Sequence, residues 1–228
     1  MDAKLKQSDE LFWGKRYRDC DAILDSLRSD PEVHWRKARS IFAQITSSSS
    51  EPSKDTLRST FIKGLEETDK GLSVNPKHAN CLTWKGICIN QIAKIEGINE
   101  RIKKAYEIQQ LWESALEVDP TNDLTLGCMG IWCFTVTDLP DVKRIFAKAF
   151  FKTPPSSTYM EALDFLKKSE KYAQRPNIRV HAALAKTYYR LKDTASARMY
   201  CEKVLASSDT GYEAEEEKEE VQKILKKI

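Results

Sequence analysis

The stretch that decides the fold is AALAKTYYRLKDTASARMYCEKVL, which spans Ala182–Leu205. Apolar residues recur at helical spacing on both sides of Lys192-Asp193, the two polar residues where we expect a turn. Tyr188 contributes an aromatic side chain to the first run, and Ala197 contributes a small side chain to the second. The stretch therefore predicts two antiparallel helices joined by a short turn.

Helix ends that run into a proline recur along the chain. Each amphipathic run closes on a polar residue, and a proline then begins the next segment, because proline tolerates only the first turn of a helix. The four segments are LDSLRSDP at Leu24–Pro31, TDKGLSVNP at Thr68–Pro76, WESALEVDP at Trp112–Pro120 and SEKYAQRP at Ser169–Pro176. Small residues follow at equivalent places, Gly86, Gly130 and Ala185, where they let paired helices approach closely. These features match the tetratricopeptide pattern, with an irregular period.

We therefore expect an all-α fold, a tetratricopeptide-like α-solenoid of about five irregular helix hairpins. A single domain should span residues 1–228, with units at roughly 1–31, 32–76, 77–120, 121–176 and 177–209 and a capping helix at 210–228. Thr210 and Glu213 predict a capping box at the start of that helix. Its apolar residues, Val221, Ile224, Leu225 and Ile228, should cover the end of the stack.

Insertions lengthen three of the units. The first is the Ser-rich segment Thr46–Asp55, which we expect to be a loop. The second lengthens a hairpin, where Gly97 should end one helix and Asn99 should start the next. The third is Asp138–Ser157, in which Pro154-Pro155 cannot lie inside a helix and so predicts a corner.

Helices are expected on both sides of this corner. Thr158 and Glu161 predict a capping box after it, and Val142–Phe150 has the periodicity of an amphipathic helix before it. A polyproline ligand is the alternative reading of the corner, and it would need a fuller P-x-x-P context.

Two inserted segments carry basic residues. Arg144, Lys148 and Lys152 are spaced by four, with Lys143 beside them, so they should form a stripe opposite the apolar face. A second cluster of basic residues opens the other lengthened hairpin and consists of Arg101, Lys103 and Lys104. Such faces suit an acidic polymer or an anionic lipid surface. The alternative is a solvated face without a function.

Composition excludes several classes of protein. The net charge is only +3, from 37 basic and 34 acidic residues, so we expect no nucleic-acid partner. The amino-terminal residues lack the apolar core of a secretory signal, and the uncharged run Leu124–Thr137 is too short to span a bilayer. The six cysteines form no Cys-x-x-Cys pair. We expect a cytoplasmic protein with reduced cysteines whose membrane contact is at most peripheral.

No residue pattern points to catalysis. His34, His78 and His181 lie in separate units, without metal-ligand spacing to cysteine or carboxylate residues. The chain has no Gly-rich phosphate loop and no nucleophile elbow. We therefore predict that the protein is not an enzyme and has no catalytic residue, metal or cofactor.

Three stretches together resemble the regulator of microtubule dynamics protein family: Gln91–Ile108, Leu126–Lys171 and Ala185–Arg198. The resemblance implies a helical-repeat protein without catalytic activity that associates with microtubules and the spindle. Some relatives carry an N-terminal membrane anchor, and their repeat domain has been linked to lipid binding. This chain starts almost at its first repeat, which favours a cytoskeletal role over an organelle tether. It has Asp141-Val142 shortly before the basic stripe, where relatives have an aromatic residue.

Our leading hypothesis is a non-enzymatic microtubule-associated scaffold of the cytoskeleton and mitotic spindle, including the spindle poles, with a role in chromosome segregation. Tubulin is the expected partner, because its outer surface is acidic. The candidate contact residues are Lys143, Arg144, Lys148, Lys152, Arg101, Lys103 and Lys104.

Two alternatives stay open. One is a module that binds a peptide or adaptor protein in its concave groove and reaches tubulin indirectly. The other is phospholipid binding in a hollow lined by Trp84, Trp132 and Tyr188. Packing of these aromatic side chains in the core is the simpler reading.

Overall fold

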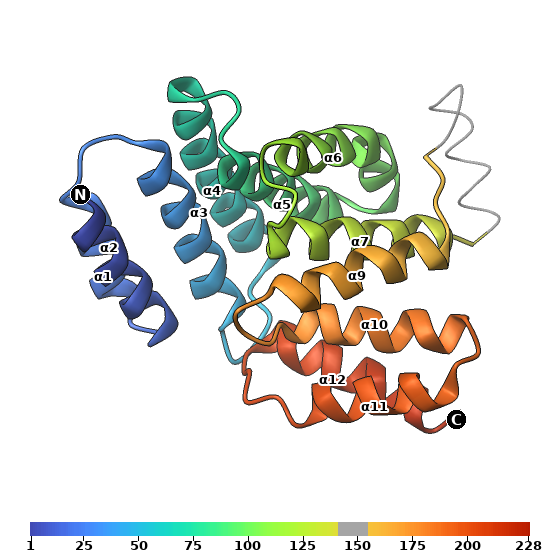
Figure 1. Ribbon diagram of the computed structural model, residues 1–228. Helices are drawn as coiled ribbons and strands as arrows, with labels where there is room; N and C mark the ends of the chain where they lie inside the picture. The colour runs from blue at the N-terminus through green and yellow to red at the C-terminus, as the bar shows by residue number, and fades with distance from the viewer. Residues whose placement is uncertain (141–154) are drawn as a thin grey trace. The chain divides into compact units, whose positions relative to one another are not determined.

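The computed structural model describes residues 1–140 and 155–228, and this part of the chain contains α-helices and no β-strand (Figure 1). The predicted all-α class is confirmed. The corner residue Pro154 and the predicted helix Val142–Phe150 lie outside the described residues.

The chain forms two compact units, Met1–Val118 and Asp119–Ile228. The first contains α1 (Asp2–Trp13), α2 (Tyr17–Asp25), α3 (Pro31–Thr46), α4 (Lys54–Val74), α5 (Ala79–Glu96) and α6 (Ile98–Val118). The second contains α7 (Asp123–Thr137), α9 (Tyr159–Tyr172), α10 (Ile178–Arg190), α11 (Thr194–Leu205) and α12 (Tyr212–Leu225). In each unit, helices that follow one another along the chain pack together as hairpins.

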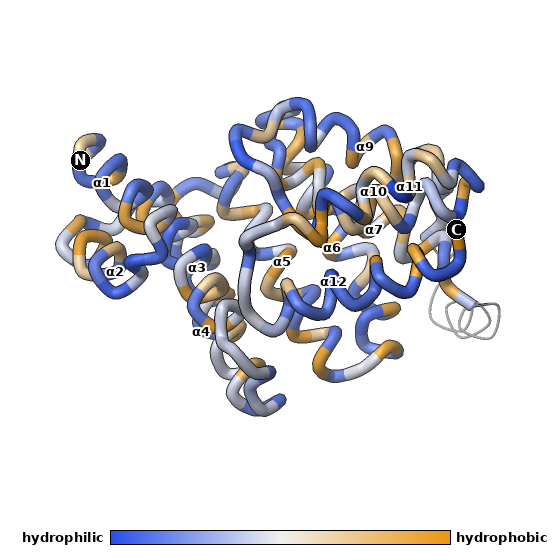
Figure 2. The backbone as a smooth tube through the Cα atoms, turned by 90° about the horizontal axis from the view of Figure 1, so that it is seen from below, coloured by the Kyte–Doolittle hydropathy of each residue, from blue (hydrophilic) through white to orange (hydrophobic). Residues whose placement is uncertain are grey.

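Within the first unit, α1 packs against α2, α3 against α4, and α5 against both α4 and α6. Within the second unit, α9 packs against α7 and α10, while α10 and α11 pack against each other and against α12. Figure 2 shows hydrophilic and hydrophobic segments alternating along the helices, as expected when one side of each helix is buried.

Side-chain caps set most of the helix starts. His78, Asn122, Asn177 and Asp193 each precede a helix and accept a hydrogen bond from a backbone N–H of its first turn. The predicted capping box of Thr158 and Glu161 is present at the start of α9. The prolines contribute differently from the prediction. Of the four prolines predicted to begin segments, only Pro31 lies in the first turn of a helix, whereas the prolines at 76, 120 and 176 lie in the loop before the capping residue.

The predicted capping box at the last helix is wrong. Gly211 precedes α12 with φ of 105°, and no side chain caps this helix. Glu213 is buried and forms an ion pair with Arg179 of α10, so its carboxylate is not available to Thr210. The helix therefore starts where glycine permits a positive φ.

The two predicted interruptions of the first unit are largely correct. The Ser-rich segment connects α3, which ends at Thr46, to α4, which begins at Lys54. Gly97 ends α5 with φ of 110°, as expected for a residue without a Cβ. The following helix begins at Ile98, so Asn99 lies in its first turn instead of preceding it.

Close packing of paired helices depends on small residues. A Cβ on Gly86 would lie 2.9 Å from Cε2 of Trp112, and a Cβ on Gly130 would lie 2.5 Å from Cγ of Leu166. Ala185 is fully buried in the core of the second unit. The structure confirms that Gly86 and Gly130 need small side chains, and it places the small side chain of Ala185 in the core.

The last helix closes the core of the second unit, as predicted. Val221 and Ile224 are buried together with Leu184 and Val204 of α10 and α11. Leu225 and Ile228, which the sequence also assigned to this face, pack against the same cluster.

Buried cysteines contribute to these cores as small apolar side chains. All six are free, and all except the partly buried Cys128 are buried. Burial raises the pKa of Cys20 to about 11 and the pKa of Cys81 and Cys88 to about 12. These three thiols are therefore protonated and unreactive at neutral pH.

No helix in residues 1–140 and 155–228 combines the length and the apolar character needed to cross a membrane.

Replacing Gly86 with alanine should destabilise the first unit by about 1–3 kcal/mol, because the added methyl group clashes with Trp112. Trp112 cannot move freely, since its Nε1–H donates to the backbone oxygen of Thr83 at 3.1 Å. Urea unfolding of both proteins measures the difference. The control is Gly14→Ala, where the nearest atom lies at 3.4 Å and the change should stay within about 0.5 kcal/mol. A G86A variant as stable as the parent would contradict the packing described above.

Candidate functional site

The first predicted basic face cannot be located. Lys143, Arg144, Lys148 and Lys152 all lie outside the described residues, so this stripe stays a prediction.

The second predicted basic cluster lies at the start of α6, and its members differ. Arg101 is partly buried, and its Nε donates to Oδ1 of Asn90 on α5 at 3.2 Å, so it does not project outward. Lys103 and Lys104 are exposed and form ion pairs with Glu100 and Glu107 of their own helix. This cluster is therefore less positive than the sequence suggests.

Of the aromatic residues considered for a lipid hollow, Trp84 and Trp132 are core residues, and Tyr188 is partly buried against the core of the second unit. Trp84 is buried in the first unit, and its ring lies 5.6 Å from that of Phe42. Trp132 is buried in the second unit, where Tyr188 stacks on Tyr200 with ring centroids 5.6 Å apart. Packing accounts for all three side chains.

The histidines have carboxylate partners. His34 lies 2.8 Å from Glu67, and His78 lies 2.9 Å from Glu32. In the part of the chain that the structure describes, no three histidine, cysteine or carboxylate side chains are grouped as metal ligands.

A basic surface that the sequence analysis did not select lies on α9 and α11. We call it the α9–α11 lysine surface, and it consists of Lys167, Lys168, Lys171 and Lys203 with the carboxylates Asp164 and Glu170. One side of α9 buries Ala162, Leu166 and Ser169 against the core. Since an α-helix has 3.6 residues per turn, the lysines of α9 lie on the opposite, exposed side.

Glu170 organises this surface. Its carboxylate accepts hydrogen bonds from Nζ of Lys167 at 2.6 Å, from the hydroxyl of Tyr200 at 2.7 Å and from Nζ of Lys203 at 3.0 Å. Tyr200 is 2% exposed, so the centre of the arrangement is anchored in the core. His181 of α10 lies 3.6 Å from the same carboxylate.

The charges at this centre are stable near neutral pH. Burial works against ionisation of Glu170, but hydrogen bonds from Lys167, Tyr200 and Lys203 outweigh it and lower the pKa of Glu170 to about 2. The hydrogen bond to Glu170 in turn raises the pKa of Lys167. Burial, with Lys203 nearby, lowers the pKa of His181, so this imidazole is neutral at pH 7.

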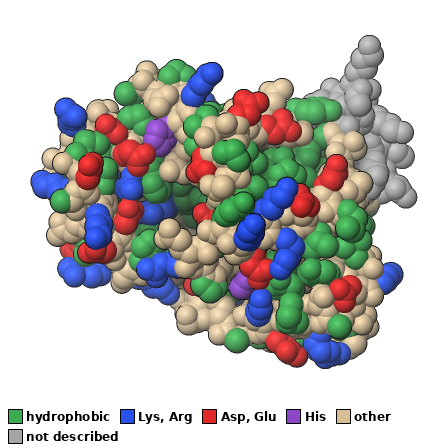
Figure 3. Space-filling model, in the orientation of Figure 1, with side chains coloured by type: hydrophobic (Ala, Val, Ile, Leu, Met, Phe, Trp, Pro, Cys, Tyr) green, Lys and Arg blue, Asp and Glu red, His purple; other side chains and the backbone are tan. Residues whose placement is uncertain are grey.

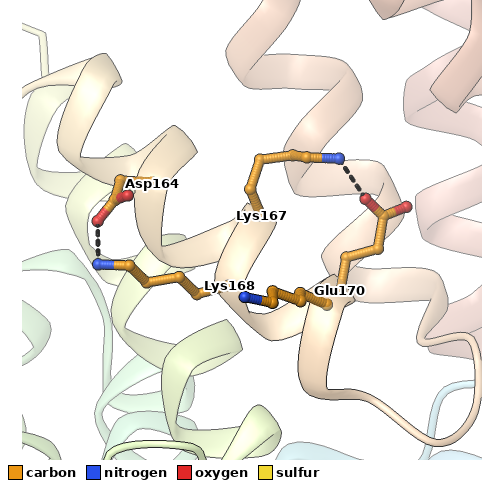
Figure 4. A pocket seen from close by; sticks show the side chains of 5 residues that line it. Asp164, Lys167, Lys168 and Glu170 are labelled. Carbon is orange, nitrogen blue, oxygen red and sulfur yellow. Dashed lines mark hydrogen bonds and ion pairs between the residues drawn. The ribbon is translucent and has the colours of Figure 1, made fainter.

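The outer lysines line a shallow pocket of about 310 Å³ along α9. Figure 4 shows Lys168 paired with Asp164 at one side of this pocket and Lys167 paired with Glu170 at the other. Lys171 also lines the pocket and has no carboxylate partner among the described residues; its Nζ lies 5.3 Å from the centre of the Tyr172 ring. Basic and acidic side chains lie together over α9 in Figure 3.

This arrangement can attract an acidic partner. Four lysines face only two carboxylates, and the ammonium groups project from two helices that share one core. An exposed ion pair contributes about 0–1 kcal/mol, so useful affinity requires several lysines acting together.

Part of the surface could have been found from sequence. The run LKKSEK at Leu166–Lys171 places three lysines in little more than one helical turn, and this spacing indicates a basic helix face. Lys203 could not have been added to them, because it comes from another helix and meets Glu170 only through the packing of α9 and α11.

Replacing Glu170 with glutamine should destabilise the protein by about 1–3 kcal/mol at pH 7. A carboxylate whose pKa is lowered by folding stabilises the folded protein when the pH is above the pKa that the carboxylate has in the unfolded chain. This stabilisation is lost as the pH falls toward the folded pKa of Glu170, which is about 2. The difference between the two proteins should therefore shrink between about pH 5 and pH 3. Urea unfolding at each pH measures it, with Glu219→Gln, at an exposed position of α12, as the control. A difference independent of pH would contradict the assigned role of Glu170.

Comparison with known proteins places the chain in a family. The model of the family described as Regulator of microtubule dynamics protein 1-3 matches residues 4–228. Regulator of microtubule dynamics protein 1 of Bos taurus is 32% identical over 203 residues, which cover 87% of this chain and 63% of that protein. Regulator of microtubule dynamics protein 3 of Xenopus laevis is 28% identical over 199 residues, which cover 85% of this chain and 42% of that protein. The chain thus spans less than two thirds of the length of these two relatives.

Among solved structures, a thermophilic TPR protein of Thermus thermophilus is similar, with a TM-score of 0.62 and 12% sequence identity. The match covers 97% of this chain and 98% of that one. At this identity the likeness concerns the fold alone, and it confirms the predicted tetratricopeptide-like solenoid. From the family model and the identities to its members, the chain belongs to the regulator of microtubule dynamics protein 1-3 family.

Proposed function

We propose that this chain takes part in the regulation of microtubule dynamics as a non-enzymatic scaffold that contacts acidic tubulin directly. The observation that carries the proposal is the family match over residues 4–228. The proposed place of action is the cytoplasmic cytoskeleton, including the spindle and its poles.

The mechanism we propose is electrostatic. Lysines of the α9–α11 lysine surface, together with Lys143, Arg144, Lys148 and Lys152, would face the acidic outer surface of the microtubule. Each contact is weak, so binding would depend on the number of lysines engaged. Salt screens exposed charges beyond about 8–10 Å at physiological ionic strength, so binding should weaken as salt rises.

Purified chain should co-pellet with purified microtubules at about 50 mM salt and pellet several-fold less at about 200 mM. A variant with Lys143, Arg144, Lys148 and Lys152 changed to Glu should pellet less at either salt concentration. The matched control changes four exposed lysines that form no ion pair among the described residues, Lys6, Lys54, Lys63 and Lys77.

The outcomes of this assay separate the alternatives. Undiminished pelleting of the first variant would remove that basic stripe from the contact. Failure of the parent chain to pellet would overturn direct contact and favour a peptide or adaptor protein as the link to tubulin. The observation that favours this second function, binding of a peptide or adaptor protein, is the tetratricopeptide-like fold.

A further inference from the structure

We infer that the α9–α11 lysine surface binds an extended peptide segment rich in glutamate. The inference rests on the proposed function in one respect: the proposed function identifies the source of this segment as an acidic stretch of the microtubule. The chemistry of the surface can be tested without microtubules.

The lysines retain donors for a ligand. Each ammonium group has three N–H donors. Lys168 directs one of them to Asp164, and Lys203 directs one to Glu170. Lys171 has no carboxylate partner among the described residues, so its charge is the least neutralised of the set.

The surface is also partly preorganised. Glu170 holds the ammonium groups of Lys167 and Lys203 beside the buried hydroxyl of Tyr200, and Nζ of Lys203 lies 4.5 Å from the Tyr200 ring centre. A side chain that is already held in place loses less rotamer freedom when a ligand binds. The ionised Glu170 therefore orients Lys167 and Lys203, while Lys168 pairs with Asp164 and Lys171 has no carboxylate partner among the described residues.

Helix geometry favours an extended ligand. Helix residues three or four apart are separated by about 4.5–6 Å along the axis. Alternate side chains of an extended chain point to the same side about 6.6 Å apart. Successive glutamates on one side of such a segment could each meet a lysine of α9, with Lys203 reached from beside the helix. The pocket is shallow and open, which suits side-chain carboxylates better than a bulky apolar group.

The experiment measures binding of fluorescein-labelled decaglutamate by fluorescence anisotropy, with labelled decaglutamine as the uncharged control peptide. We expect decaglutamate to bind, decaglutamine not to bind, and the affinity for decaglutamate to fall between about 50 mM and about 200 mM salt. The variant K168E/K171E should weaken binding by about tenfold or more. Both positions are exposed, and neither lysine donates a hydrogen bond to Glu170, so the variant should fold, as circular dichroism would show.

A matched control variant, K63E/K77E, changes two exposed lysines of the first unit and should bind decaglutamate like the parent. Absence of decaglutamate binding, or equal loss in both variants, would overturn the inference. Binding to vesicles containing anionic phospholipid without binding to decaglutamate would also overturn it, because the ligand would then be a membrane surface.

Microtubules distinguish this inference from the proposed function. Limited proteolysis removes the glutamate-rich tails of tubulin. If the chain still pellets with such microtubules, and if K168E/K171E pellets like the parent, the inference is overturned while direct contact with microtubules stands. Decaglutamate binding by a chain that fails to pellet with intact microtubules would overturn the proposed function while supporting the peptide-binding inference.

Discussion

The close approach of paired helices at small residues is the constraint on which the rest of this structure depends. Gly86 lies against Trp112 in the first unit, and Gly130 lies against Leu166 in the second. A Cβ at either position would force the two helices of a hairpin apart, because these interiors are packed without spare room. Burying one side of each helix in this way also decides which residues are left to face solvent.

The lysines of α9 are a consequence of that packing. Leu166 enters the contact with Gly130, so the residues that follow it, Lys167 and Lys168, lie on the outside. Packing of α11 beside α9 then brings Lys203 to the carboxylate of Glu170. The core and the charged surface are thus two sides of the same helices, and the buried hydroxyl of Tyr200 connects them.

Family membership and surface chemistry address different parts of the functional question. Membership in the regulator of microtubule dynamics protein family points to a cellular process. The α9–α11 lysine surface suggests how contact could be made, through several weak charge pairs on a preorganised centre. Glu170 already neutralises part of the charge of Lys167 and Lys203. A partner would therefore need many carboxylates, since each single ion pair contributes little free energy.

The sequence by itself determined the all-helical class and several of the helix starts and ends. Gly97, the capping box of Thr158 and the apolar face of α12 all follow from rules that act over a few residues. Only the tertiary structure decided which charges are available. In the folded chain, Arg101 donates a hydrogen bond to Asn90. Glu213 forms an ion pair with Arg179, and Lys203 forms one with Glu170. The physical reason is that propensity and periodicity are local, whereas the partner of a charged side chain is set by helices that meet only after folding.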